Sequence, residues 1–181
     1  AGQYSLANTI AASTAAKRML LLGDPQQLPQ VTQGKHPEPI DGSALGWLTG
    51  EHEVIPGEFG YFLPDSWRME GEVCKVVSDN FYDSQLGSAA PMRKLEDINP
   101  GFFPISISHR GNSTESIEEA EKVVELVEKV IHRAWTDKGE TQILADSKEN
   151  IIVVAPYNAQ VQLIRKHLDA AGFEDIPVGT V

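Results

Sequence analysis

Cysteine and positive charge are both scarce in this chain of 181 residues. The single cysteine, Cys74, excludes a framework of internal disulfides and any zinc site built from several cysteines, which suits a reducing compartment. Long apolar runs are lacking too, since none approaches the roughly 20 residues that span a membrane. The first residues, AGQYSLANTI, lack the basic and apolar regions of a secretion signal. We therefore expect a cytoplasmic protein without a membrane partner.

Lysine and arginine number 15 against 26 aspartate and glutamate residues, which gives a net charge of −11. A protein that binds nucleic acid mainly by neutralising phosphates has the opposite balance, so any such binding here has to be local. Six glutamates and two lysines fall within ESIEEAEKVVELVEK, residues 115–129, which we interpret as the solvated face of a helix. The remaining composition, 41% hydrophobic, is typical of a globular chain.

Helical and extended patterns alternate along the sequence. The spacing of apolar residues predicts helices over residues 5–17, 43–50, 70–82, 116–135 and 159–172, and strands over residues 18–22, 102–108, 151–155 and 176–181. The clearest helix is the fourth, whose apolar stripe consists of Ile117, Ala120, Val124, Val127, Ile131 and Ala134. Strands separated by helices indicate an α/β fold with a parallel sheet between layers of helices.

Glycine and proline are concentrated in residues 32–64, in segments such as TQGKHPEPIDG and IPGEFG. This composition predicts a connector between two domains. We therefore expect a domain boundary in this connector, between residues 1–31 and residues 65–181.

Polar residues follow the first predicted strand directly, in the sequence LLLGDPQQLP of residues 20–29. Ligands of parallel α/β sheets collect at the carboxyl ends of the strands, so Asp24, Gln26 and Gln27 are candidate site residues. The alternative is structural, because Asp-Pro after glycine is good turn chemistry and glutamine is common on surfaces.

The turn is one of several motifs that occur in order along the chain. GDPQQLPQV resembles the third motif of superfamily 1 helicases of the Upf-like (DNA2/NAM7) branch, and AGQ at residues 1–3 resembles the end of their Walker B sequence. DSWRMEGEV with SDNFYDSQL is similar to the family's Tyr-Arg-Met-His-Pro motif and its downstream Phe-Tyr-x-x-x-Leu, VVAPYNAQVQLIRKHL to its Pro-Tyr-x-x-Gln segment, and VGTV to the start of its fifth motif. The resemblance covers nearly the whole chain.

The resemblance implies a RecA-like P-loop NTPase fold, with the end of one RecA-like domain and most of a second, and a helicase that hydrolyses ATP with Mg²⁺ at the cleft between them. Gln27 is the candidate sensor of the γ-phosphate, since its amide both donates and accepts. Arg68 is the candidate arginine finger, with a salt bridge to a neighbouring glutamate as its alternative. Gly23 and Gln3 would line the same cleft, and Asp24 is expected to cap the turn or to hold a neighbouring loop rather than to bind metal.

Nucleic-acid contacts are implied for Tyr157, Asn158 and Thr180, which lie at predicted strand ends. The alternative for Tyr157 is a half-buried packing role. The three tryptophans have spacings that favour packing over base stacking. The five histidines have no metal-ligand spacing. The expected partners are single-stranded nucleic acid, in particular DNA, and the remainder of the same polypeptide, with a nucleoid or nuclear location according to the organism.

Some features of the family have no counterpart here. No G-x-x-x-x-G-K-[ST] phosphate loop occurs, and the two Walker B acids would precede Ala1. Trp67 replaces the usual tyrosine, Gly71 and Glu72 stand near the His-Pro position, and Gln30 replaces a second proline. We interpret the chain as an internal fragment of a larger motor, with most Mg²⁺ and triphosphate ligands outside it, and expect no ATPase activity from it alone. Two alternatives remain: a non-catalytic nucleic-acid-binding or interaction module with this fold, and another nucleotide-dependent α/β enzyme.

Overall fold

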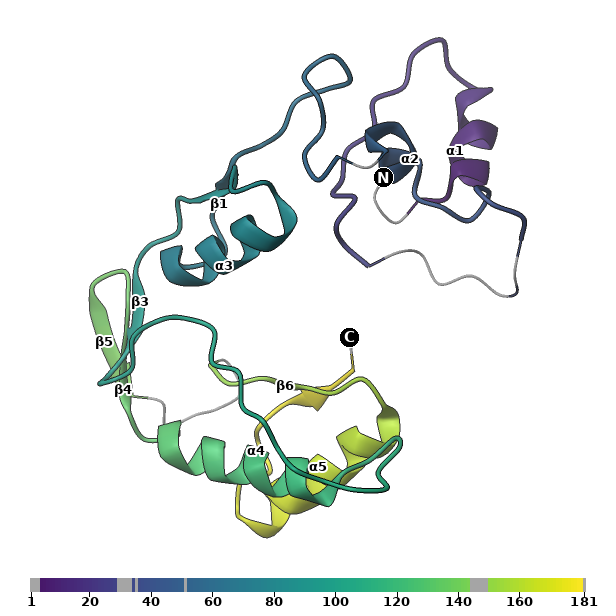
Figure 1. The fold of residues 1–181 in the computed structure, drawn as a ribbon. Helices are drawn as coiled ribbons and strands as arrows, with labels where there is room; N and C mark the ends of the chain where they lie inside the picture. The colour runs from purple at the N-terminus through teal and green to yellow at the C-terminus, as the bar shows by residue number, and fades with distance from the viewer. Residues whose placement is uncertain (1–3, 29–33, 35, 51, 144–149, 181) are drawn as a thin grey trace. The chain divides into compact units, whose positions relative to one another are not determined.

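A computed structural model describes residues 4–28, 34, 36–50, 52–143 and 150–180. The chain divides into two compact units, an N-terminal unit of residues 1–90 and a C-terminal unit of residues 91–181 (Figure 1). The border between the units lies beyond the predicted connector of residues 32–64, and the domain boundaries inferred from the sequence stay predictions.

Three helices form in the N-terminal unit: α1 (Leu6–Ser13), α2 (Ala44–Thr49) and α3 (Gly71–Phe81). Helix α1 begins where the Ser5 side chain accepts a hydrogen bond from the Asn8 N–H at 3.2 Å. It ends before the predicted residue 17, because the hydroxyls of Ser13 and Thr14 bond carbonyls three residues back and favour a helix end. The expected helices over residues 43–50 and 70–82 are confirmed.

The strands β1 (Asp65–Ser66) and β2 (Gly87–Ser88) pair in parallel on either side of α3 in the sequence. Parallel neighbours need such a crossover, so β1, α3 and β2 form a short βαβ unit. The Glu70 carboxylate caps α3 by accepting from the Glu72 N–H at 2.9 Å, and Cys74 and Ser78 are buried on its inner face.

Two predicted strands are wrong. Residues 18–22 and 102–108 belong to no strand, and Leu20, Leu22 and Phe102 are 80%, 73% and 73% exposed. An apolar run forms a buried strand only where strands on either side satisfy its backbone groups. Within the described ranges, neither segment pairs with a strand.

The core of the C-terminal unit lies between two helices, α4 (Ile117–Val130) and α5 (Asn158–Ala170), and two parallel strands, β6 (Val153–Val154) and β7 (Val178–Gly179). The helices lie side by side (Figure 1). The predicted stripe of α4 is buried at Ala120, Val127 and Ile131. Helix α5 ends at Ala170, and the predicted stop signal, Gly172, follows its C-cap residue with a φ of +82°, which suits glycine.

The helix predicted over residues 116–135 is too long, because the chain leaves α4 after Val130 and forms an antiparallel sheet. Strand β4 (Ala134–Asp137) pairs with β3 (Arg93–Leu95) and with β5 (Glu140–Ile143). Lys138 and Gly139, with φ of +51° and +85°, form the two-residue turn of the β4–β5 hairpin. Trp135 therefore lies on a strand, not on a helix.

The α/β class predicted from the alternating pattern is confirmed by the helices and the parallel strand pairs. None of the helices in the described part of the chain combines the length and the apolarity needed to span a membrane.

Candidate functional site

The turn of residues 24–27 is organised by one carboxylate. Oδ1 of Asp24 accepts from the Gln26 N–H at 3.0 Å, and Oδ2 accepts from the Gln27 side-chain amide at 3.3 Å. The Gln27 N–H also lies 3.5 Å from the Asp24 carbonyl oxygen. Asp24 thus caps the turn, which is the role expected for it.

A tyrosine far along the sequence closes this arrangement. The Tyr82 hydroxyl, just beyond the end of α3, donates to Oδ2 of Asp24 at 2.6 Å. The Tyr82 ring lies 6.0 Å from that of Phe62, between centroids. Burial and the hydrogen bond to Asp24 raise the pKa of Tyr82 far above its ordinary value, so the hydroxyl stays protonated and remains a donor.

A second set of hydrogen bonds, through Glu53, links the turn of residues 24–27 to the chain after α3. The Gln26 side-chain amide donates to the Glu53 carbonyl at 3.4 Å, and the Glu53 carboxylate accepts from the Asp83 N–H at 3.1 Å. The turn is therefore joined at two points to the chain that follows α3.

The structure places the two members of the predicted catalytic pair on different segments of the N-terminal unit. Gln27 is exposed and is tied through Asp24 to the C-terminal end of α3, whereas Arg68, also exposed, precedes the N-terminal end. Both residues lie in the N-terminal unit, and Gly23 directly precedes the turn. Gln3 lies outside the described residues, and the phosphate-binding roles stay predictions.

The predicted nucleic-acid residues do converge. Strands β6 and β7 are parallel neighbours, with Val154 opposite Gly179, so the residues after them emerge at one edge of the sheet. Tyr157 and Asn158 follow β6, Thr180 follows β7, and all three are exposed.

The same edge carries the N-terminus of α5. Tyr157 occupies the N-cap position without a side-chain hydrogen bond to the helix. Backbone N–H groups at the start of a helix attract anions such as phosphate. The edge therefore combines backbone donors, a hydroxyl and an aromatic ring.

Gln160 is a structural residue that sequence reasoning left without a role, although it belongs to the Pro-Tyr-x-x-Gln motif. It is only 4% exposed, accepts from the Ser116 N–H at 2.6 Å and donates to the Ser116 carbonyl at 3.1 Å. Its amide also lies 3.4 Å from the Glu119 carboxylate. Since the Ser116 hydroxyl caps α4 through the Glu119 N–H at 3.2 Å, Gln160 fixes the start of α4 against the first turn of α5.

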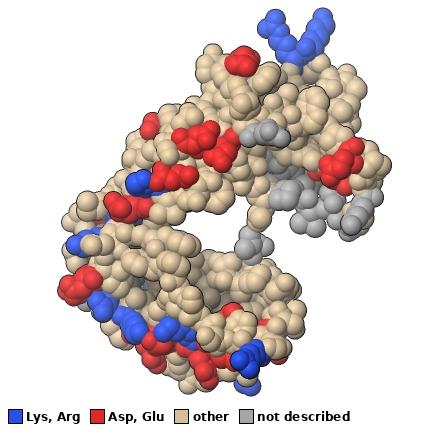
Figure 2. All heavy atoms as spheres, viewed as in Figure 1, with Lys and Arg blue, Asp and Glu red and all other residues tan. Residues whose placement is uncertain are grey.

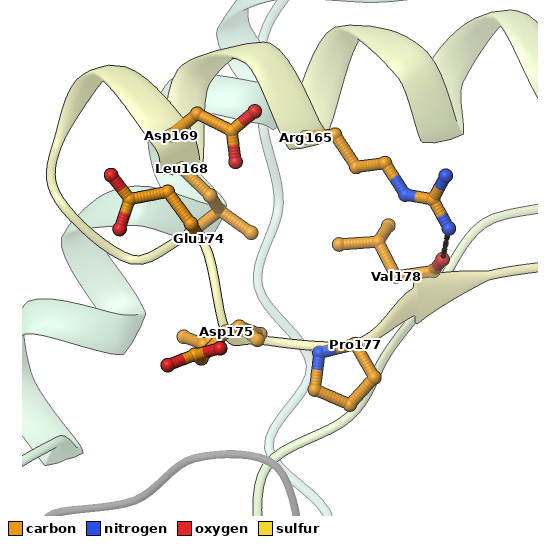
Figure 3. Close-up of a pocket in the computed structure, with 8 residues that line it drawn as sticks. Arg165, Leu168, Asp169, Glu174, Asp175, Pro177 and Val178 are labelled. Carbon is orange, nitrogen blue, oxygen red and sulfur yellow. Dashed lines mark hydrogen bonds between the residues drawn. The ribbon is translucent and has the colours of Figure 1, made fainter.

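A pocket of about 440 Å³ lies elsewhere in the C-terminal unit, between the second half of α5 and the amino end of β7 (Figure 3). Asp169, Glu174 and Asp175 contribute carboxylates to it, and Arg165 donates to the Val178 carbonyl at 2.7 Å. Three acids beside an arginine that bonds a carbonyl make poor surroundings for a phosphate. The pocket therefore does not suit a nucleotide.

Charges of both signs are intermixed where α4 is exposed (Figure 2). Lys122 and Lys129 both donate to the Glu125 carboxylate, the first at 2.6 Å, and together they lower the pKa of Glu125 to about 2. A surface whose charges pair locally offers little long-range attraction to a phosphate backbone, so binding would depend on placed groups such as those at the β6–β7 edge.

The exposed amide of Gln27 and the exposed guanidinium of Arg68 are each of a chemical type that bonds phosphate oxygens. A magnesium site is not formed by the described residues. Both carboxylate oxygens of Asp24 already accept hydrogen bonds. The described residues also contain no group of three or more His, Cys, Asp or Glu side chains placed to bind a metal ion.

Comparison with known proteins gives matches over most of the chain. Residues 52–181 match the family described as an AAA domain. Helicase SEN1 of Saccharomyces cerevisiae is 26% identical over 178 residues, which cover 89% of this chain and 7% of that protein. DNA polymerase alpha-associated DNA helicase A of Schizosaccharomyces pombe is 26% identical over 179 residues, 91% of this chain and 26% of that protein.

Helicase sen1 of Schizosaccharomyces pombe is 26% identical over 166 residues, which cover 83% of this chain and 9% of that protein. The chain thus spans about a quarter or less of the length of these curated relatives. No solved structure gives a significant match.

Proposed function

We propose, from the premise that this chain belongs to the AAA-domain family, that the protein carrying it is an ATP-dependent helicase or translocase acting on single-stranded nucleic acid. The resemblance to superfamily 1 helicases of the Upf-like branch, and the RecA-like P-loop NTPase fold that it implied, are confirmed by the family match and by the three helicases. The observation that carries the proposal is the extent of that similarity, which covers at least 83% of the chain in each case.

The proposed ATP side consists of Gln27 and Arg68. ATP, when bound, supplies the γ-phosphoryl group whose hydrolysis releases the energy for translocation. The Gln27 amide would bond a phosphate oxygen or orient the attacking water, and Arg68 would neutralise charge that develops on the phosphoryl oxygens. Their convergence on one phosphate is a prediction for the nucleotide-bound protein. Most of the magnesium ligands are proposed to come from outside this chain.

The proposed nucleic-acid side is the β6–β7 edge. The Thr180 hydroxyl and the N–H groups at the start of α5 would bond phosphate oxygens, which positions a strand without reading its sequence. The Tyr157 ring, half exposed, would lie against a base or sugar. These contacts are few and local, in keeping with a chain of net charge −11.

DNA is the proposed substrate. The proposed compartment is the cytoplasm, with a nucleoid or nuclear location according to the organism. One relative is named a DNA helicase, which supports DNA over RNA. Matched DNA and RNA oligonucleotides test this point, and stronger stimulation of ATP hydrolysis by RNA would reverse the assignment.

The test is steady-state ATP hydrolysis by the full-length protein with single-stranded DNA. Gln27→Ala and Arg68→Ala are each expected to lower kcat at least roughly 100-fold, since each removes a group from the transition state. Gln162→Ala and Arg18→Ala, at exposed positions, are the matched controls and should retain wild-type turnover. Wild-type kcat in both site variants would refute the assigned roles, and a full-length protein without ATPase activity would favour a non-catalytic binding module.

A further inference from the structure

We propose that Tyr82 is a positioning residue for Gln27, acting through the carboxylate of Asp24. This inference rests on the proposed function, because it concerns the glutamine assigned to the γ-phosphate. Oδ2 of Asp24 accepts from two donors, the Tyr82 hydroxyl at 2.6 Å and the Gln27 amide at 3.3 Å. The shorter bond comes from a residue 58 positions away in the sequence.

The end of α3 is built to hold the tyrosine in place. Asp83 and Ser84, which follow it, have φ of +50° and +57°, a left-handed conformation that non-glycine residues adopt at a cost. Ser84 is fixed there by hydrogen bonds from its N–H to the Ser78 carbonyl at 3.0 Å and from its hydroxyl to Asp79 at 2.8 Å. This turn reverses the chain directly after Tyr82 and leaves the ring packed near Phe62.

The two donors share one oxygen. The short bond from the Tyr82 hydroxyl fixes the Asp24 carboxylate, and the fixed carboxylate orients the Gln27 amide. Without the hydroxyl, the carboxylate can turn, and the Gln27 amide loses its fixed orientation. The link through Glu53 remains when the hydroxyl is removed, since it uses Gln26 and the Asp83 N–H. Removal of the hydroxyl should therefore leave the fold of the turn intact and change only the orientation of the Gln27 side-chain amide.

The experiment compares Tyr82→Phe with Tyr61→Phe in the full-length protein. Both remove one hydroxyl, but Tyr61 is 96% exposed, whereas the ring that remains at position 82 can still pack near Phe62. In DNA-stimulated ATP hydrolysis, Tyr82→Phe should lower kcat about tenfold and leave the KM for ATP within about twofold. Tyr61→Phe should leave both constants within about twofold of wild type. An equal effect of the two substitutions, or a change in KM alone, would overturn the inference.

Asp24→Asn tests the same link from the acceptor side, and it decides the matter if Tyr82→Phe proves too unstable to assay. It should reproduce the fall in kcat, and adding Tyr82→Phe should lower kcat no further, because both changes break one interaction. Multiplied effects in the double variant would show that Tyr82 acts independently of Asp24. If Gln27→Ala is inactive while Tyr82→Phe and Asp24→Asn are normal, this inference fails and the proposed function stands. An inactive wild type overturns both.

Discussion

Replacing Gln160 by leucine should loosen the start of α4. The side chain is buried and makes two short bonds to the backbone of Ser116, which is itself 4% exposed. Leucine has a similar size but can neither accept from the Ser116 N–H nor donate to its carbonyl. A buried N–H left without an acceptor costs about 1–3 kcal/mol, and the lost carbonyl bond about 0.5–1.5 kcal/mol.

Burial of the leucine side chain offsets part of this loss, since its apolar atoms leave water. The expected net effect is about 2 kcal/mol, which corresponds to roughly 30-fold more frequent local opening. Native-state hydrogen exchange of the intact protein, read on peptides that cover α4, measures this opening directly.

The matched control is Gln162→Leu, in the same helix but at an exposed position. It should change exchange in α4 by less than about threefold, because surface substitutions lie within about 0.5 kcal/mol. Equal rates of hydrogen exchange in α4 for Gln160→Leu and Gln162→Leu would show that the hydrogen bonds between Gln160 and Ser116 do not hold the start of α4 against α5.

Three further predictions concern other parts of the C-terminal unit. The Glu125 carboxyl, whose pKa is lowered to about 2 by Lys122 and Lys129, should titrate near that pH by NMR, and Lys129→Met should raise the midpoint of that titration. Because the pKa of Glu125 is lower in the folded protein than in the unfolded chain, the ionised carboxylate stabilises the fold at pH values above the unfolded pKa. This stabilisation is lost as the pH falls toward 2. Tyr157→Ala should weaken binding of single-stranded DNA by about 1–3 kcal/mol in fluorescence anisotropy, and unchanged affinity would favour the packing role. Gly139→Ala should lower the melting temperature, because alanine is strained at φ +85°, while leaving DNA-stimulated ATPase unchanged; an unaltered melting temperature would contradict this account of the β4–β5 turn.

The sequence predicted best the elements whose causes are local. Helix α5 shows its apolar spacing and its glycine stop within one segment, and α3 its amphipathic pattern. The predicted end of α4 lies too far along the chain, because Ala134 continues the helical spacing of apolar residues. The strand with which Ala134 pairs, β5, lies beyond a turn, so the local spacing does not reveal this pairing. Residues 18–22 have the composition of a buried strand, yet composition cannot supply the neighbours that such a strand needs.

The site was predicted in the same uneven way. Asp24 was expected to cap its turn from the local Gly-Asp-Pro sequence, and its partner, the Gln26 N–H, lies only two residues away. The Tyr82 and Gln160 bonds join residues 58 and 44 positions apart, and no periodicity reports contacts at that separation. Both residues fell inside matched motifs, so the signal that pointed to them was the motif and not the local chemistry.

The central claim is that Gln27 and Arg68 serve one terminal phosphate. A structure of the full-length protein with a non-hydrolysable ATP analogue and magnesium tests it most directly. The account predicts the Gln27 amide and the Arg68 guanidinium within about 3 Å of oxygens on the terminal phosphate. A bound analogue whose terminal phosphate is contacted by neither side chain would contradict it.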